Sequence, residues 1–245
     1  MGIFESIVLG IVQGLTEFLP VSSSGHLVLI GKVLPSFKEP GILFEVFLHA
    51  GTMLAILIYF RKKLVRLTKK CLILIIIGNI PAFVIGFLFQ SFFENLFEKT
   101  AAVGLAFFIT ACFNYITNQT ASNKKNISLA DSFFVGLFQA IAIVPGISRS
   151  GSTIFAGVKR GIDKKTAAEF SFLLSVPAII GANALEFFRN GFNDSINFSL
   201  YFLGFITSFF VGYLAIYLVI KLLTQEKFKY FSFYCLVIGI IALLA

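Results

Sequence analysis

Two short polar stretches interrupt an otherwise apolar chain, and they carry the residue types that could do chemistry. The first, residues 17–26, reads EFLPVSSSGH and contains one carboxylate and one imidazole. The second, residues 144–153, reads VPGISRSGST and contains one guanidinium. Each follows an apolar segment, includes a proline and leads into another apolar segment. Ionisable groups in such surroundings are expected to be functional.

The second stretch has the groups that bind a phosphate. Arg149 offers a planar fork of N–H donors, and the start of the helix that follows favours an anion. Further hydrogen bonds to the anion could come from the hydroxyl groups of Ser148, Ser150, Ser152 and Thr153. The alternative is structural: the serines cap a helix, and Arg149 neutralises Glu17.

The first stretch could supply the reacting groups. Glu17 would repel a phosphate unless a divalent cation lay between them, or it could instead orient a base or a nucleophile. His26 is a candidate general base or nucleophile, and the hydroxyl groups of Ser22 and Ser23 are candidate nucleophiles. Another pair, Glu45 and His49 at i and i+4, fits an interior hydrogen-bonded pair and a catalytic role equally well.

The composition predicts a polytopic helical membrane protein that holds these groups. Of the 245 residues, 58% are hydrophobic and 13% are charged, against roughly 25% charged in soluble domains. The net charge of +8 does not indicate a nucleic-acid partner, because many of the basic residues gather in segment 61–70, which is typical of a cytoplasmic loop. Three scattered cysteines predict neither disulfides nor a zinc site.

The lengths of the apolar segments predict two kinds of element. Segments 2–18 and 22–34 are too short to cross the membrane comfortably, so we expect them to form a re-entrant helix–loop–helix. Residues 94–99 are expected to form a polar turn. Full spans are predicted at 41–60, 71–92, 101–118, 166–188, 198–220 and 229–245.

The pattern then repeats at an offset of 126 residues. Segment 10–13 aligns with 136–139, and Ser22, Ser24 and Gly25 fall on Ser148, Ser150 and Gly151. One re-entrant hairpin plus three spans makes an odd number of crossings, so the halves 1–120 and 130–245 should insert in opposite senses within a single membrane domain.

The basic residues predict the orientation. Segments 61–70, 124–125, 159–165 and 221–229 carry most of the lysines and arginines and would all be cytoplasmic. Both termini would then be extracytoplasmic. The first hairpin would enter from outside and the second from the cytoplasm, so the two polar tips would meet near the midplane.

These residues resemble the undecaprenyl-diphosphate phosphatase family of the bacitracin-resistance type. The first motif of that family stands here as QGLTE at 13–17 followed by PVSSSGH at 20–26, and the second stands as PGISRSGST at 145–153. The resemblance extends over the whole chain. It implies an enzyme of the bacterial plasma membrane that hydrolyses undecaprenyl diphosphate to the monophosphate and phosphate, recycling the lipid carrier for cell-wall synthesis and conferring bacitracin resistance.

The resemblance also implies roles for the motif residues. Glu17 would be the essential acidic residue, His26 and Ser23 would be the base and the nucleophile in an order left open, and Arg149 would bind the diphosphate. Substrate-binding groups would come from Gln13, Ser22, Ser148, Ser150 and Thr153. A divalent cation, Mg²⁺ or Ca²⁺, would bind at Glu17 through the substrate phosphates. Gln13 stands where some members have glutamate, which would weaken metal binding if both carboxylates are needed.

Two rival classes were compared with this assignment. Type 2 phosphatidic-acid phosphatases share the Ser24–Gly25–His26 element, but they need a histidine after the arginine segment, and none follows Arg149. A lipid-phosphate flippase is the stronger alternative, because inverted repeats with broken helices are typical of transporters. A homodimer is compatible with the sequence.

Overall fold

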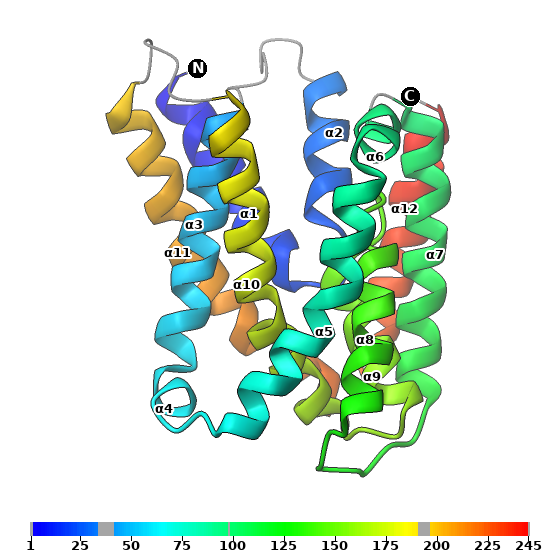
Figure 1. The fold of residues 1–245 in the computed structure, drawn as a ribbon. Helices are drawn as coiled ribbons and strands as arrows, with labels where there is room; N and C mark the ends of the chain where they lie inside the picture. Colours follow the sequence, from blue (N-terminus) through cyan, green and yellow to red (C-terminus); the bar gives the residue numbers. More distant parts are fainter. Residues whose placement is uncertain (1, 34–41, 98, 191–196, 245) are drawn as a thin grey trace.

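The computed structural model describes residues 2–33, 42–97, 99–190 and 197–244, and within these ranges its elements are all helices, joined by turns and loops, without a β-sheet (Figure 1). The helices are α1 (Ile3–Phe18), α2 (Ser23–Val33), α3 (Ile42–Tyr59), α4 (Arg61–Leu64), α5 (Lys69–Leu88), α6 (Gln90–Phe97), α7 (Thr100–Gln119), α8 (Leu129–Ile141), α9 (Arg149–Lys159), α10 (Lys164–Asn190), α11 (Phe198–Thr224) and α12 (Lys229–Leu244).

Four of the described helices, α5, α7, α10 and α11, are long and apolar enough to cross a membrane. The predicted spans at 41–60 and 229–245 correspond to shorter apolar helices, α3 and α12. Large apolar side chains point outward from several helices, including Phe83 at 72% exposure and Leu214 at 66%. Such a surface suits lipid rather than water, so the chain is a multi-pass membrane protein.

One local prediction was wrong. Residues 94–99 were expected to form a polar turn, yet α6 occupies Gln90–Phe97 and begins after α5 ends at Leu88. Apolar residues at 92, 93, 96 and 97 recur at helical spacing, and this pattern outweighs the few charges nearby. The other predicted helices agree with the structure to within a few residues at each end.

The small and polar face of α1 points into the bundle, as predicted. Gly10 and Gly14 lie against α11, where an added Cβ would come within 2.9 Å of the backbone oxygens of Gly204 and Ser208. The same relation holds for α8 and α5: a Cβ on Gly136 would lie 2.3 Å from the carbonyl oxygen of Gly78. Close backbone approach of this kind is typical of helices packed inside membranes.

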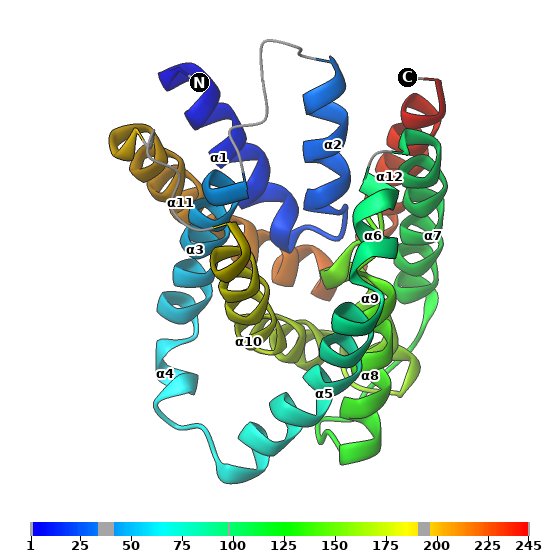
Figure 2. The ribbon, with the colours of Figure 1, turned by 45° about the horizontal axis from the view of Figure 1, so that its top comes forward.

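The two short hairpins begin in the same register. Helices α1 and α8 start at Ile3 and Leu129, and helices α2 and α9 start at Ser23 and Arg149, an offset of 126 residues in both cases. Both termini lie at one end of the molecule, and α4 lies at the other (Figures 1 and 2).

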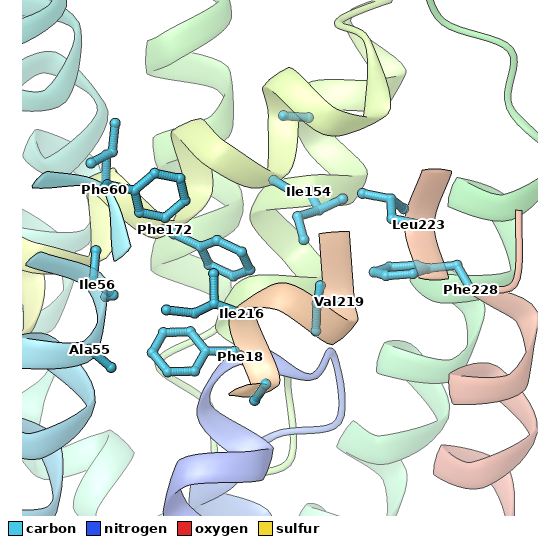
Figure 3. Packing of buried hydrophobic residues seen from close by; sticks show 14 of the residues in the cluster. Phe18, Ala55, Ile56, Phe60, Ile154, Phe172, Ile216, Val219, Leu223 and Phe228 are labelled. Carbon is cyan, nitrogen blue, oxygen red and sulfur yellow. The ribbon is translucent and has the colours of Figure 1, made fainter. Parts of the chain in front are cut away.

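A buried apolar cluster fixes the end of α1 relative to the second half of the chain. Phe18 is fully buried and meets Phe172 of α10 edge to face, with ring centroids 5.5 Å apart. Ile56 of α3, Ile154 of α9 and Ile216 of α11 complete the cluster around them (Figure 3). Since Glu17 precedes Phe18, burial of this ring determines where the carboxylate lies.

Candidate active site

The tips of the two hairpins touch. A Cβ on Gly25 would lie 3.0 Å from Cα of Gly146, and one on Gly151 would lie 3.2 Å from Cβ of Pro20. Gly146 has a φ of +94°, which glycine adopts without strain, whereas Ser22 holds the left-handed region at φ +68°. Strained backbone at a non-glycine residue is common at functional sites, which fits a functional role for the first tip.

Two polar residues of α7 hold the tips together. The hydroxyl of Thr110 donates to the carbonyl oxygen of Gly146 at 2.9 Å and accepts from the backbone N–H of Ser148 at 2.9 Å. The amide of Asn114 donates to the carbonyl oxygen of Pro20 at 2.7 Å. Sequence reasoning missed both residues, although polar residues at i and i+4 in the apolar segment 101–118 were an available signal.

Glu17 is the centre of the contacts between the tips. Its Oε2 accepts hydrogen bonds from Nε2 of Gln13 at 3.0 Å and from Oγ of Ser23 at 2.9 Å. Its Oε1 accepts from Nη2 of Arg149, which arrives from the other half of the chain. The structure therefore brings together four predicted site residues from α1, α2 and α9, around a carboxylate that is only 7% exposed.

Two buried polar atoms beside Glu17 have no hydrogen-bond partner among the residues that the structure describes. They are Nη1 of Arg149, a donor, and Oε1 of Gln13, an acceptor. A buried polar group without a partner is costly, so native structures rarely leave one without a reason. A guanidinium N–H with nothing to bind fits an anionic ligand, and an amide oxygen with nothing to bind fits a cation or a ligand donor.

The remaining serines and Thr153 hold the shape of the tips. Ser22 and Ser148 each accept a hydrogen bond from the backbone N–H of the glycine three residues on, Gly25 at 3.3 Å and Gly151 at 3.1 Å. These are helix caps, as the serine-rich stretches predict. Ser150 lies 3.3 Å from the carbonyl oxygen of Leu19. Their service as phosphate ligands stays a prediction, as does that of Thr153, which is buried with its hydroxyl 2.6 Å from Oγ of Ser171.

The hydrogen bonds of His26 go to Ser22 and to the last helix. Its Nδ1 is 2.6 Å from the carbonyl oxygen of Ser22, and its Nε2 is 2.7 Å from the hydroxyl of Tyr234 on α12. In the described part of the chain no hydrogen bond joins His26 to Ser23, the two residues expected to act as base and nucleophile. Tyr234 was not singled out from the sequence.

The other histidine is the one that faces Glu17. Nε2 of His49, on α3, lies 3.8 Å from Oε2 of Glu17, and its Nδ1 lies 2.9 Å from the carbonyl oxygen of Glu45. His49 therefore contacts the backbone oxygen of Glu45 with one ring nitrogen and faces Glu17 with the other. Sequence periodicity had joined His49 to Glu45 but gave no signal that it approaches Glu17.

The residues present fit a divalent cation only in part. Within the described chain no group of three His, Cys, Asp or Glu side chains could hold a metal. Glu17 and Oε1 of Gln13 supply a carboxylate and an amide oxygen, both hard donors. Mg²⁺ is commonly held by one or two such ligands with the remainder from substrate phosphates and water, and these two side chains fit that mode.

Comparison with known proteins identifies the family of this chain. Residues 6–241 match the model of the family described as bacitracin resistance protein BacA. The chain belongs to the BacA family. The match includes both of the stretches, 17–26 and 144–153, that meet around Glu17 in this structure.

Named relatives cover nearly the whole chain. It is 42% identical to undecaprenyl-diphosphatase 4 of Bacillus thuringiensis subsp. konkukian, over 99% of this chain and 97% of the relative. It is 40% identical to the undecaprenyl-diphosphatase of Carboxydothermus hydrogenoformans, over 98% and 96%, and 38% identical to that of Methanobrevibacter smithii, over 98% and 96%. The resemblance seen in the motifs is thereby confirmed.

Proposed function

We propose that this BacA-family protein hydrolyses undecaprenyl diphosphate to undecaprenyl phosphate and inorganic phosphate in the membrane. The observation that carries the proposal is the meeting of Ser23, Glu17 and Arg149 at the two touching tips. The names of relatives at 38–42% identity support the same reaction. Recycling of the carrier serves cell-wall synthesis and opposes bacitracin.

In the first step, Ser23 acts as the nucleophile and Glu17 as its base. Oγ of Ser23 attacks the terminal phosphorus while its proton passes to Oε2 of Glu17, an atom to which it already donates at 2.9 Å. The new Oγ–P bond replaces the bond from phosphorus to the bridging oxygen. The bridging oxygen leaves with undecaprenyl phosphate and takes the proton from Glu17. Water then attacks the phosphoserine and gives a proton to Glu17, which passes it to Oγ of Ser23 as the Oγ–P bond breaks and inorganic phosphate is released.

Arg149 binds the phosphoryl oxygens during this step. Nη1 is buried without a protein partner and is available to the substrate, while Nη2 keeps the carboxylate of Glu17 in place. A fixed guanidinium stabilises the charge that builds on the phosphoryl group as the bond to the leaving group breaks. The carboxylate and the phosphates repel one another, and both Arg149 and a cation would reduce that repulsion.

A divalent cation, Mg²⁺ or Ca²⁺, is part of the proposal. Glu17 and Gln13 would hold it together with the substrate phosphates, and when bound it would neutralise charge on those phosphates. The role of the two side chains is to present oxygen atoms to the cation. Because Gln13 is neutral, Glu17 would be the one negatively charged side chain of the pair that binds the cation.

The finer topology is also proposed. Each half would consist of one re-entrant hairpin and three spans, in opposite orientations, with both termini outside the cytoplasm. The shared register of α1 with α8 and of α2 with α9 supports this arrangement, and so does the placement of both termini opposite α4 (Figure 1).

We expect cysteines introduced at Lys62 and Lys164 to react with an impermeant thiol reagent from the same, cytoplasmic face. Both positions belong to the basic segments that the positive-inside bias assigns to the cytoplasm. The native cysteines at 71, 112 and 235 are first replaced by serine or alanine. Labelling of the two positions from opposite faces would refute the re-entrant hairpins.

Purified protein in detergent should release inorganic phosphate from a short-chain prenyl diphosphate, and EDTA should stop that release until Mg²⁺ or Ca²⁺ is added back. The short chain is used because it is soluble, so no step of lipid transfer is needed. The readout is a colorimetric phosphate assay on the full chain.

The same assay separates the enzyme from the flippase alternative. A transporter would move the lipid across vesicles without releasing phosphate. The control is the protein with Ser23→Ala, which keeps Glu17 and Arg149 but lacks the nucleophile. Equal phosphate release by wild type and Ser23→Ala would remove Ser23 from the mechanism, and no release by wild type would overturn the enzyme.

A further inference from the structure

The hydrogen bond between His26 and Tyr234 links the first tip to the last helix. The hydroxyl of Tyr234 lies 2.7 Å from Nε2 of His26, and the two rings are nearly parallel, at 5°. Phe107 of α7 closes the other side of the imidazole, edge to face, with ring centroids 5.3 Å apart. His26 is 9% exposed, and Tyr234, Phe107 and Ser22 together hold its orientation.

The contacts define where the proton of the neutral ring sits. The partner of Nδ1 is a backbone carbonyl, which can only accept, so Nδ1 carries the hydrogen and donates to Ser22 at 2.6 Å. Nε2 is then an acceptor, and the hydroxyl of Tyr234 donates to it. Tyr234 thus stabilises the tautomer that anchors the carbonyl of Ser22, the residue with the left-handed backbone at φ +68°.

In the second half of the chain a side chain also donates to the carbonyl oxygen of the capping serine, but within the described chain it has no counterpart of Tyr234 bound to it. At the matching offset of 126 residues, Ser152 replaces His26, and its hydroxyl donates to the carbonyl of Ser148 at 2.7 Å. A small side chain is therefore enough to anchor a tip. Phe108 stands at the position that matches Tyr234, and it has no hydroxyl to donate. The imidazole and the phenol form a pair that belongs to the first tip.

We propose that Tyr234 is a positioning residue for the reaction, acting through His26 and Ser22 on the nucleophile Ser23. Ser23 follows the anchored residue directly and donates to Glu17 at 2.9 Å. Holding Ser22 in its strained conformation keeps the hydroxyl of Ser23 aimed at the carboxylate. This inference rests on the proposed function, in which Ser23 attacks the phosphate.

Tyr234→Phe removes the donor and keeps the ring. We expect kcat/KM to fall about two- to tenfold, the size expected when the buried imidazole of His26 loses one hydrogen bond, with the loss in kcat rather than in KM. The matched control is Tyr230→Phe, one turn earlier on α12, where the side chain is 59% exposed. Rates equal to the control at matched folded protein would overturn the positioning role.

A second readout does not depend on activity. The chain has only two histidines, so ¹⁵N-histidine labelling gives a simple spectrum, and His49→Gln assigns it. In the wild type His26 should show a protonated Nδ1 and an acceptor Nε2. Tyr234→Phe should shift the Nε2 resonance of His26, and Tyr230→Phe should not. An unchanged His26 resonance in Tyr234→Phe overturns the proposal even if the protein proves to have no phosphatase activity.

A double-mutant comparison tests the route through His26. His26→Ser copies the anchor found at Ser152 and removes the group that Tyr234 binds. In that background Tyr234→Phe should cost nothing further, because coupled residues are not additive. Independent losses that multiply would show that Tyr234 acts by another route and would overturn the inference.

Discussion

Replacing Arg149 with lysine should lower phosphate release by about 10²–10³-fold, although the charge is kept. The guanidinium uses Nη2 for Glu17 and leaves Nη1 buried without a protein partner. An ammonium is a point charge without the planar fork, so it cannot hold the carboxylate and a phosphoryl oxygen at the same time. Loss of one fixed electrostatic donor typically costs this much in turnover.

The comparison is made with Arg66→Lys, which changes an exposed arginine of the basic segment 61–70. That variant should keep wild-type rates. Burying a guanidinium costs at least ~2.5–3.5 kcal/mol, so a change at Arg149 can alter folding as well as turnover. Both variants are therefore compared with the wild type at equal amounts of monodisperse folded protein. Turnover by Arg149→Lys within a few-fold of the wild type would leave Arg149 as a structural ion pair with Glu17.

Glu17→Gln should lose most activity, by about 10²–10⁴-fold, while the protein still inserts. The change removes the proposed base, to which Ser23 donates its hydroxyl hydrogen, and a positioned base typically contributes that much. It also removes the anion paired with Arg149. Measured phosphate release at saturating Mg²⁺ tests the first effect, because added cation cannot replace a proton acceptor.

Folding is followed separately, since Glu17→Gln leaves a guanidinium that is 17% exposed without its partner. A loss of thermal stability in Glu17→Gln that is reversed in Glu17→Gln/Arg149→Gln would identify the unpaired charge as its cause. If the single variant turns over at near-normal rate, the carboxylate has no part in the reaction.

The helices of this protein could be predicted because local patterns specify them. Proline at 20 and 145 and the serines at 22 and 148 punctuate apolar segments, and the caps that they predict are present. The expected face of α1 points inward for the same reason, as its glycines permit close packing. The turn predicted at 94–99 failed because an apolar pattern continued through the charges there.

The site could be predicted only where the two motifs supply it. The sequence predicted that the two tips meet, and Glu17, Ser23 and Arg149 do come together there. His49, Thr110, Asn114 and Tyr234 come from α3, α7 and α12. Their positions depend on how helices pack side by side, and a single sequence carries no pattern for those long-range neighbours.

The shared register of the tips limits what a symmetric version of this site could contain. Ser23 and Arg149 are the first residues of α2 and α9 and occupy equivalent positions. Two identical tips brought together in the same way would place two hydroxyls or two guanidiniums at these positions. Because the tips differ in sequence, Glu17 meets a hydroxyl from one tip and a guanidinium from the other, a combination that identical subunits could not supply.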